Sequence, residues 1–129
     1  MRHNSPPDSV HALEPGDLKS PDITLFCVWE NVELLGCGAL KHIDDVHGEI
    51  KSMITNPQHL RKGVASAMLV HIIEEARSRG YRKLSLETGC GNYFVAAQNL
   101  YSKHGFRYCG PFATYADDGF AVFMTRNLV

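Results

Sequence analysis

A basic, glycine-containing loop that runs directly into a helical pattern is the segment of this chain with the clearest chemical potential. Residues 59–69 read HLRKGVASAML, in which Arg61 and Lys62 precede Gly63. The first N–H groups of a helix have no partner within the helix and lie at its positive dipole end, so a phosphate group can bind there. Cations are ordinarily disfavoured at this end. The segment therefore predicts a site for an anionic, nucleotide-like ligand.

Two common phosphate-binding loops do not fit this sequence. A nucleoside triphosphate P-loop needs a second glycine upstream and a lysine after the last glycine, whereas Lys62 precedes the only glycine of the loop. The dinucleotide fingerprint is begun by Gly89 and Gly91, but Phe94 stands at its third glycine position. Neither ATP nor a dinucleotide is favoured.

The cysteines and histidines show no spacing that favours a metal ion. Cys27, Cys37, Cys90 and Cys109 contain no Cys-x-x-Cys pair, and we expect them to be reduced and structural. The polar segment 42–47, which holds two histidines and two aspartates, is typical of a solvated hairpin turn. We predict no metal site. A thiol-dependent acyltransferase would use Cys90, for which no histidine partner is apparent.

The pattern of apolar residues predicts one domain, residues 1–129, of the α/β class. Its 44% hydrophobic content is enough for a single core, and residues 1–22 form a proline-rich, loosely specified segment. The glycines at 36 and 38 suggest a bulge or a close backbone approach within the second strand. We expect strands at 23–30, 34–42, 49–55, 83–88, 106–109 and 119–126, and helices at 63–79 and from Asn92, its cap, to 104. These elements predict a mixed, mostly antiparallel sheet with a central parallel pair, flanked by helices.

Charge and hydropathy favour a cytoplasmic protein. The formal net charge of −1 offers no general attraction to nucleic acid. No apolar run approaches the roughly 18 residues that a membrane-spanning helix needs, and the first residues lack the apolar core of a signal peptide. We therefore expect neither a nucleic-acid partner nor a membrane.

Two motifs together resemble the GNAT superfamily of acyl-CoA-dependent N-acetyltransferases. The first is the glycine loop 60–65 with its helix, and the second is the segment 97–106, AQNLYSKHGF. With the meander and the Glu-Ile strand that precede the loop, the resemblance covers roughly residues 23–126. It implies the GNAT fold with its first strand apparently missing, and acetyl-CoA as the cofactor.

The resemblance also implies how coenzyme A is held. Backbone N–H groups at the helix start bind the pyrophosphate, and the third strand bulges and splays from its parallel neighbour so that its backbone binds the pantetheine arm and polarises the thioester. The expected cofactor-binding residues are Met53, Ile54, Thr55, Arg61, Lys62, Gly63, Val64, Ala65, Tyr101 and Lys103. Leu60 and Phe94 replace polar residues that many members carry, which removes two expected polar contacts.

Two residues match the catalytic groups of the family. Tyr101 matches the tyrosine that protonates the departing thiolate, although its place on an apolar helix stripe also suits a core tyrosine. Glu49 matches a glutamate that serves in some members as general base, directly or through water, although an exposed strand carboxylate would have the same pattern. Glu87, on the neighbouring parallel strand, is the reserve base.

The function that follows is transfer of an acetyl group from acetyl-CoA to a primary amine of a small molecule or peptide, by direct attack. The alternative is a non-catalytic CoA-binding or interaction module. The acceptor is left open, and the residues expected to face it are Phe94, Phe112, Tyr115, Asp117 and Asp118. Because only 22 residues precede Ile23, a sheet edge is expected to be exposed unless the chain is a shortened form, and a homodimer is a further expectation.

Overall fold

The elements of the fold follow the predicted order closely. The computed structural model describes residues 22–56, 63–113, 115–117 and 119–129, apart from the side chains of Ser52 and Tyr93. Its elements are β1 (Ile23–Glu30), β2 (Glu33–Asp44), β3 (His47–Thr55), α3 (Val64–Ser78), β4 (Lys83–Gly89), the 3-10 turn η2 (Asn92–Phe94), α4 (Val95–Lys103), β5 (Arg107–Cys109) and β6 (Ala121–Asn127). Among these described residues, no helix is both long and apolar enough to cross a membrane.

The strands form one mixed sheet in the order β1-β2-β3-β4-β6-β5. β3 and β4 are parallel to each other, and the other neighbouring strands run antiparallel. The predicted fold class is thereby confirmed. β1 lies at one edge of the described sheet and β5 at the other.

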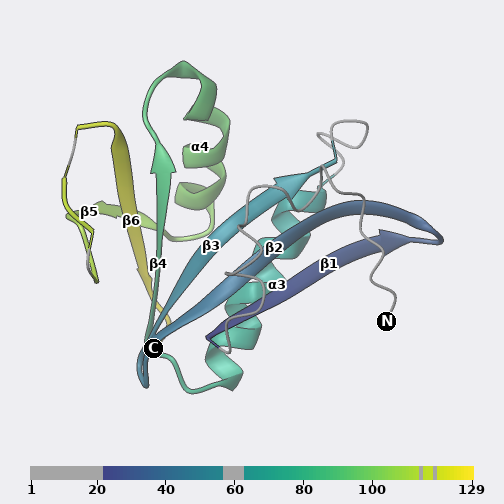
Figure 1. The fold of residues 1–129 in the computed structure, drawn as a ribbon, viewed down its shortest axis with the longest axis horizontal. Helices are drawn as coiled ribbons and strands as arrows, with labels where there is room; N and C mark the ends of the chain where they lie inside the picture. The colour runs from purple at the N-terminus through teal and green to yellow at the C-terminus, as the bar shows by residue number, and fades with distance from the viewer. Residues whose placement is uncertain (1–21, 57–62, 114, 118) are drawn as a thin grey trace.

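The parallel pair opens partway along its length. Pairing runs from His47 and Lys83 to Ile50 and Leu86, whereas β3 continues to Thr55 and β4 to Gly89. Figure 1 shows the two strands close together near the C-terminal label and diverging from there, with α4 beside the opening. The expected splay of the third strand is thus present in the structure.

A bulge in β3 coincides with the opening. Leu40 of β2 pairs with Ile50 while Ala39 pairs with Ser52, so Lys51 is the extra residue. Ile50 therefore lies in the core and Met53, three positions further on, packs against the same core, which a regular strand with a period of two would not allow.

α3 covers the β2–β3 half of the sheet and packs closely on two glycines. Its buried stripe is Val64, Met68, Leu69, Ile72, Ile73 and Ala76. A Cβ at Gly36 would lie 2.8 Å from the carbonyl oxygen of Ile54, and one at Gly38 would lie 3.1 Å from both Met68 and Ile72. The β1–β2 ladder also shifts register opposite Gly36, between Val28 and Trp29. Both features expected of these glycines, a bulge and a close approach, are confirmed.

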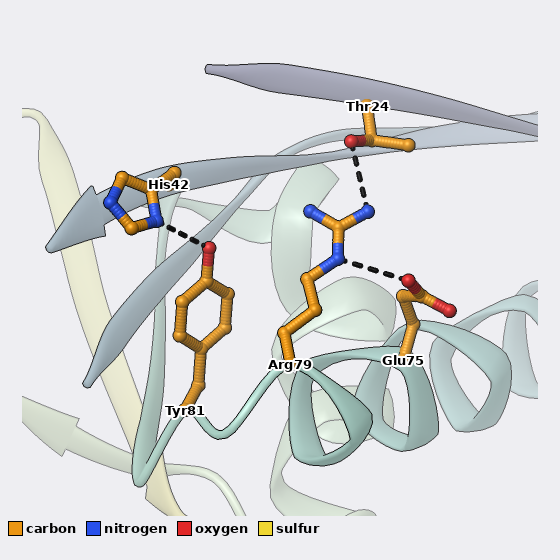
Figure 2. Close-up of polar contacts among 5 residues, drawn as sticks. All are labelled: Thr24, His42, Glu75, Arg79 and Tyr81. Carbon is orange, nitrogen blue, oxygen red and sulfur yellow. Dashed lines mark hydrogen bonds and ion pairs between the residues drawn. The ribbon is translucent and has the colours of Figure 1, made fainter. Parts of the chain in front are cut away.

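Polar contacts hold the far end of α3 to the first two strands (Figure 2). Arg79 donates hydrogen bonds to Glu75 at 2.9 Å and to Thr24 of β1 at 3.0 Å. The Tyr81 hydroxyl lies 2.7 Å from Nδ1 of His42 on β2. Nearby, Asp44 accepts a hydrogen bond from the Val46 N–H, so the polar segment 42–47 contains the expected hairpin turn.

The predicted cap of the second helix is wrong. Asn92 begins η2 rather than capping α4, and neither η2 nor α4 has a side-chain cap. The chain enters through Gly91, whose φ of 92° is left-handed, and the Phe94 N–H donates to the Gly91 carbonyl at 3.1 Å. The backbone turn through Gly91 therefore takes the place of the side-chain cap that the sequence predicted at Asn92.

Candidate active site

A cavity of about 780 Å³ lies where β3 and β4 separate, a volume within the usual range for small-molecule sites. Its walls come from the ends of both strands, the first turn of α3, α4 and the start of β6. The lining residues are Ile50, Lys51, Met53, Ile54, Thr55, Ala65, Glu87, Thr88, Gly89, Phe94, Ala96, Ala97, Leu100, Tyr101, Phe120 and Ala121. Lys51 and Glu87 are the charged residues among them.

The first turn of α3 faces this cavity without a side-chain cap. Gly63 is the N-cap residue, and the turn contains no acidic residue. Ala65, the second residue of the helix, lines the cavity. Among the described residues, no side chain caps the first helical N–H groups, which is the arrangement that an anion site at this helix start requires. Residues 60–62, including Arg61 and Lys62, lie outside the described residues.

Gly63 is required by its backbone conformation. Its φ of 80° lies in the left-handed region, and a Cβ added there would meet nothing within 4 Å. Gly80, which follows α3 at the other end, has a φ of 86° and equally open surroundings. The two positions form a matched pair for mutagenesis, because they impose the same backbone strain at opposite ends of one helix.

Tyr101 extends from α4 into the wall of the cavity. Its side chain is 8% exposed and contacts the ring of Phe106 edge-on. Burial raises the pKa of Tyr101 to about 12, so the phenol keeps its proton throughout the neutral range. A contact of 2.8 Å between Ser66 Oγ and His104 Nε2 ties the end of α4 to the first turn of α3. Tyr101 is therefore both a core residue and a cavity residue.

Glu49 lies behind the cavity wall rather than in it. It is 3% exposed and does not line the cavity in the described part of the chain. Its Oε2 accepts a hydrogen bond of 2.6 Å from the hydroxyl of Tyr115. The same hydroxyl accepts a hydrogen bond of 3.0 Å from Nζ of Lys51, which does line the cavity. Glu49 is not the exposed strand carboxylate that its sequence pattern also allowed.

An aromatic cluster beside this buried carboxylate joins two residues of the segment between β5 and β6 to rings on β3 and β6. The ring of Phe112 packs against Tyr115, Phe123 and His47 at centroid distances of 5.2 to 5.7 Å. Tyr115 also contacts Phe123 at 5.8 Å. Of the residues expected to face an acceptor, Phe112 and Tyr115 are thus brought beside Glu49, and Phe94 lines the cavity.

A row of buried polar groups lies next to the cluster. His47 Nε2 lies 2.7 Å from Ser85 Oγ, which is 3.0 Å from Thr125 Oγ1. Burial, aided by the charge of Lys83, lowers the pKa of His47 below 6.5. A neutral imidazole is therefore favoured at this position.

The structure brings together half of the residues predicted for the cofactor. Met53, Ile54, Thr55, Ala65 and Tyr101 line the cavity, as does the reserve base Glu87. Val64 is buried under β2, Gly63 is exposed beside the cavity, and Lys103 is exposed in the last turn of α4; among the described residues these do not line it.

Lys51 and Phe120 were not identified from sequence. Phe120 remains 77% exposed although it lines the cavity. Lys51 could have been suspected, because it stands two positions from Glu49 on a strand and hence near it. Nothing in the sequence around Phe120 signals its position.

Comparison with known proteins assigns the family. The sequence pattern of the acetyltransferase (GNAT) family matches residues 2–106, which is most of the chain. The chain belongs to the GNAT family. The resemblance inferred from the glycine loop and the second motif is confirmed, and with it the class of enzyme, an acetyl-CoA-dependent N-acetyltransferase.

Similar GNAT proteins include two bacterial relatives and a structure with cofactor. The uncharacterized N-acetyltransferase YsnE of Bacillus subtilis is 57% identical over 96% of this chain and 82% of its own length. The uncharacterized N-acetyltransferase YedL of Escherichia coli is 49% identical over 99% and 80%. A GNAT family acetyltransferase from Elizabethkingia anophelis, crystallised with acetyl-CoA bound, has a TM-score of 0.70 at 24% identity, covering 82% of this chain and 76% of that one.

Proposed function

We propose that this GNAT enzyme transfers the acetyl group of acetyl-CoA to a primary amine of a small molecule or peptide by direct attack in the cavity between β3 and β4. One observation carries the proposal: a single cavity joins the uncapped first turn of α3, the end of β3 that no longer pairs with β4, and the hydroxyl-bearing Tyr101. The first is a site for the pyrophosphate, the second a backbone site for the pantetheine arm, and the third a proton donor for the departing thiolate. These groups follow one another along coenzyme A in the same order.

The pyrophosphate of coenzyme A binds at the first turn of α3. N–H groups of Gly63, Val64 and Ala65 donate to it, and the left-handed Gly63 lets the chain turn into the helix beside the ligand. Arg61 and Lys62, which precede this turn in sequence, add positive charge to the same site. These two charges compensate for the polar contact that is lost because Leu60 replaces a polar residue.

The pantetheine arm runs along the end of β3, on the side that faces away from β2. Beyond Ile50, this strand stays paired with β2 but no longer pairs with β4, and Met53, Ile54 and Thr55 line the cavity there. An amide-rich arm can pair with them as a strand would. A backbone N–H near the bulge polarises the thioester carbonyl, because a fixed donor stabilises the oxyanion that forms when the amine attacks.

Tyr101 assists departure of the thiolate. Burial raises the pKa of Tyr101 to about 12, above that of an ordinary thiol, so outright proton transfer from the phenol to the sulfur is unfavourable. Tyr101 therefore acts mainly by donating a hydrogen bond to the sulfur as negative charge develops on it. The proton that finally makes the free thiol comes from solvent or from the attacking amine.

Glu49 is the base that receives the proton of the acceptor. An alkylammonium ion is not nucleophilic, so a proton must leave before or during attack. Glu49 is the carboxylate beside the opening of the sheet, and Glu87 is the alternative that contacts the cavity itself. The acceptor enters past Phe94 and Phe120, whose rings suit an amine with an apolar body.

The setting of the enzyme is a further part of the proposal. We place it in the cytoplasm, where acetyl-CoA is made, and we expect a homodimer in which a second copy covers the edge strand β1. Sedimentation of the full chain at micromolar concentration tests the dimer.

Calorimetric titration with acetyl-CoA tests the cofactor site. We compare the wild type with Gly63→Glu, which places a carboxylate at the proposed pyrophosphate site, and with Gly80→Glu, its matched control at the other end of α3. Binding should be lost in the first variant and kept in the second. Equal losses would show that helix strain, rather than the anion site, determines affinity. No binding by the wild type would contradict the proposed function.

A further inference from the structure

Glu49 needs an intermediary to reach an acceptor. At 3% exposure, its carboxylate does not contact the cavity, and Oε2 is already bonded to Tyr115. A base must come within hydrogen-bond reach of the proton that it removes. The buried position is thus incompatible with direct contact between Glu49 and a bound amine.

A three-residue hydrogen-bonded chain leads from the cavity to this carboxylate. Lys51 lines the cavity and donates from Nζ to the Tyr115 hydroxyl at 3.0 Å, and that hydroxyl donates to Glu49 at 2.6 Å. Both distances fall within ordinary hydrogen-bond lengths, and the second is short, as expected for a phenol bonded to a carboxylate.

The middle residue is fixed by its surroundings. The ring of Tyr115 packs against Phe112 and Phe123, and Nζ of Lys51 lies 5.6 Å from the ring centroid. Lys51 is itself the bulge residue of β3, at the point where the sheet opens. The chain is therefore assembled by one bulge and one aromatic cluster, at the place where the acceptor must attack the thioester.

We propose that Lys51 and Tyr115 form a proton relay that carries the proton of the acceptor amine to Glu49. A proton of Lys51 passes to the oxygen of Tyr115 while the proton of Tyr115 passes to Oε2 of Glu49, which leaves Lys51 as a neutral amine with an electron pair. That electron pair then takes a proton from the acceptor ammonium, whose N–H bond breaks and whose electron pair stays on nitrogen. The acceptor becomes neutral, Lys51 and Tyr115 recover their initial forms, and Glu49 holds the proton. This relay rests on the proposed acetyl transfer.

The test compares variants of all three residues by thiol release from acetyl-CoA. The probes are phenethylamine, L-phenylalanine, spermidine and triglycine, and each that the wild type acetylates is used. Glu49→Gln, Tyr115→Phe and Lys51→Met should each lower kcat by roughly 100- to 10,000-fold. The double variant Glu49→Gln/Tyr115→Phe should be no worse than its slower parent, because both changes break one chain. Tyr108→Phe, which removes an exposed hydroxyl bonded to Gln98, is the matched control and should keep kcat.

The pH dependence separates a relay from mere structural support. The defect of each variant should shrink as the pH approaches about 10, where an alkylamine begins to lose its proton unaided. Acetyl-CoA affinity by calorimetry should stay unchanged, which also confirms folding. Because Lys51→Met interrupts the same chain from its outer end, the test does not depend on the Tyr115 variant alone.

The outcomes distinguish the relay from the function on which it rests. Wild-type kcat in Tyr115→Phe beside a slow Glu49→Gln would overturn the relay and leave the acetyltransferase intact. A raised KM for L-phenylalanine with unchanged kcat in Lys51→Met would also overturn it, since Lys51 would then bind a substrate carboxylate. Absence of amine-dependent release by the wild type would reject both.

Discussion

Ile50 on β3 and Leu86 on β4 are the last residues paired between the two parallel strands, and the cavity begins at this pair. Both side chains belong to the core, so the closed part of the sheet is held by packing immediately next to the open part. The bulge at Lys51 follows directly. A stable sheet and an open site thus meet within two residues, which keeps the backbone at the opening well positioned for chemistry.

Removing the hydroxyl of Tyr101 should slow acetyl transfer without weakening cofactor binding. Tyr101→Phe keeps the ring that packs against Phe106 but removes the donor to the departing sulfur. We expect kcat for thiol release to fall roughly 100-fold, the usual effect of losing one transition-state donor. Stopped assays at saturating acetyl-CoA measure this effect. An unchanged kcat would limit Tyr101 to a core role.

Acid should destabilise the fold through His47. Its pKa is lowered in the folded chain, so below pH 6.5 the unfolded chain binds more protons than the folded one. The contribution of a neutral His47 to stability is complete above pH 6.5 and is lost as the pH falls from 6.5 through the lowered pKa of the folded chain. Urea unfolding at pH 7.5 and pH 5 should show a smaller decrease in His47→Gln than in the wild type. Equal decreases would indicate that other groups dominate.

A methyl group at Gly48 should destabilise the end of the sheet opposite the cavity opening. Its Cβ would lie 2.8 Å from two ring carbons of Tyr81, which bonds to His42. We expect Gly48→Ala to cost about 1 to 3 kcal/mol of unfolding free energy, as overpacking usually does. Gly110→Ala is the control, because a Cβ there meets nothing within 4 Å. Similar unfolding midpoints for the two variants would contradict the packing described.

Thiol labelling should separate the cysteines by burial. Cys37 is buried, and burial raises its pKa to about 11, whereas Cys90 is exposed. A maleimide at pH 7.5 should modify Cys90 quickly and leave Cys37 unmodified until the chain unfolds. Peptide mass mapping reads out both sites. Cys90→Ser should retain thiol release; its loss would favour a covalent acyl-cysteine mechanism instead.

Much of this fold follows from local sequence signals. Strong alternation and apolar periodicity predicted the strand and helix spans, and the glycines at 36 and 38 predicted close packing that α3 provides. The cap at Asn92 failed because a backbone turn through Gly91 competes with side-chain capping on equal terms. Whether the backbone turn or the side-chain cap forms depends on the direction from which the chain approaches α4, and no local sequence pattern determines that direction.

The site was predictable only in its local parts. Ala65 and Tyr101 each belong to a short continuous motif, so neighbouring residues alone were enough to single them out. The bond between Tyr115 and Glu49 joins residues 66 positions apart, and Tyr115 lies in the connection between β5 and β6. The burial of Glu49 depends on that same connection, so a strand pattern alone predicted an exposed carboxylate as readily as a base.

Amine-dependent release of coenzyme A by the wild-type chain is the most direct measurement of the proposed reaction. Thiol release from acetyl-CoA is followed with and without phenethylamine, L-phenylalanine, spermidine or triglycine, and the mass of the acetylated amine is measured by mass spectrometry. We predict release that requires at least one amine and yields a product heavier by one acetyl group. Tight binding of acetyl-CoA with equal release in the presence and absence of every amine would contradict acetyl transfer and favour a cofactor-binding module.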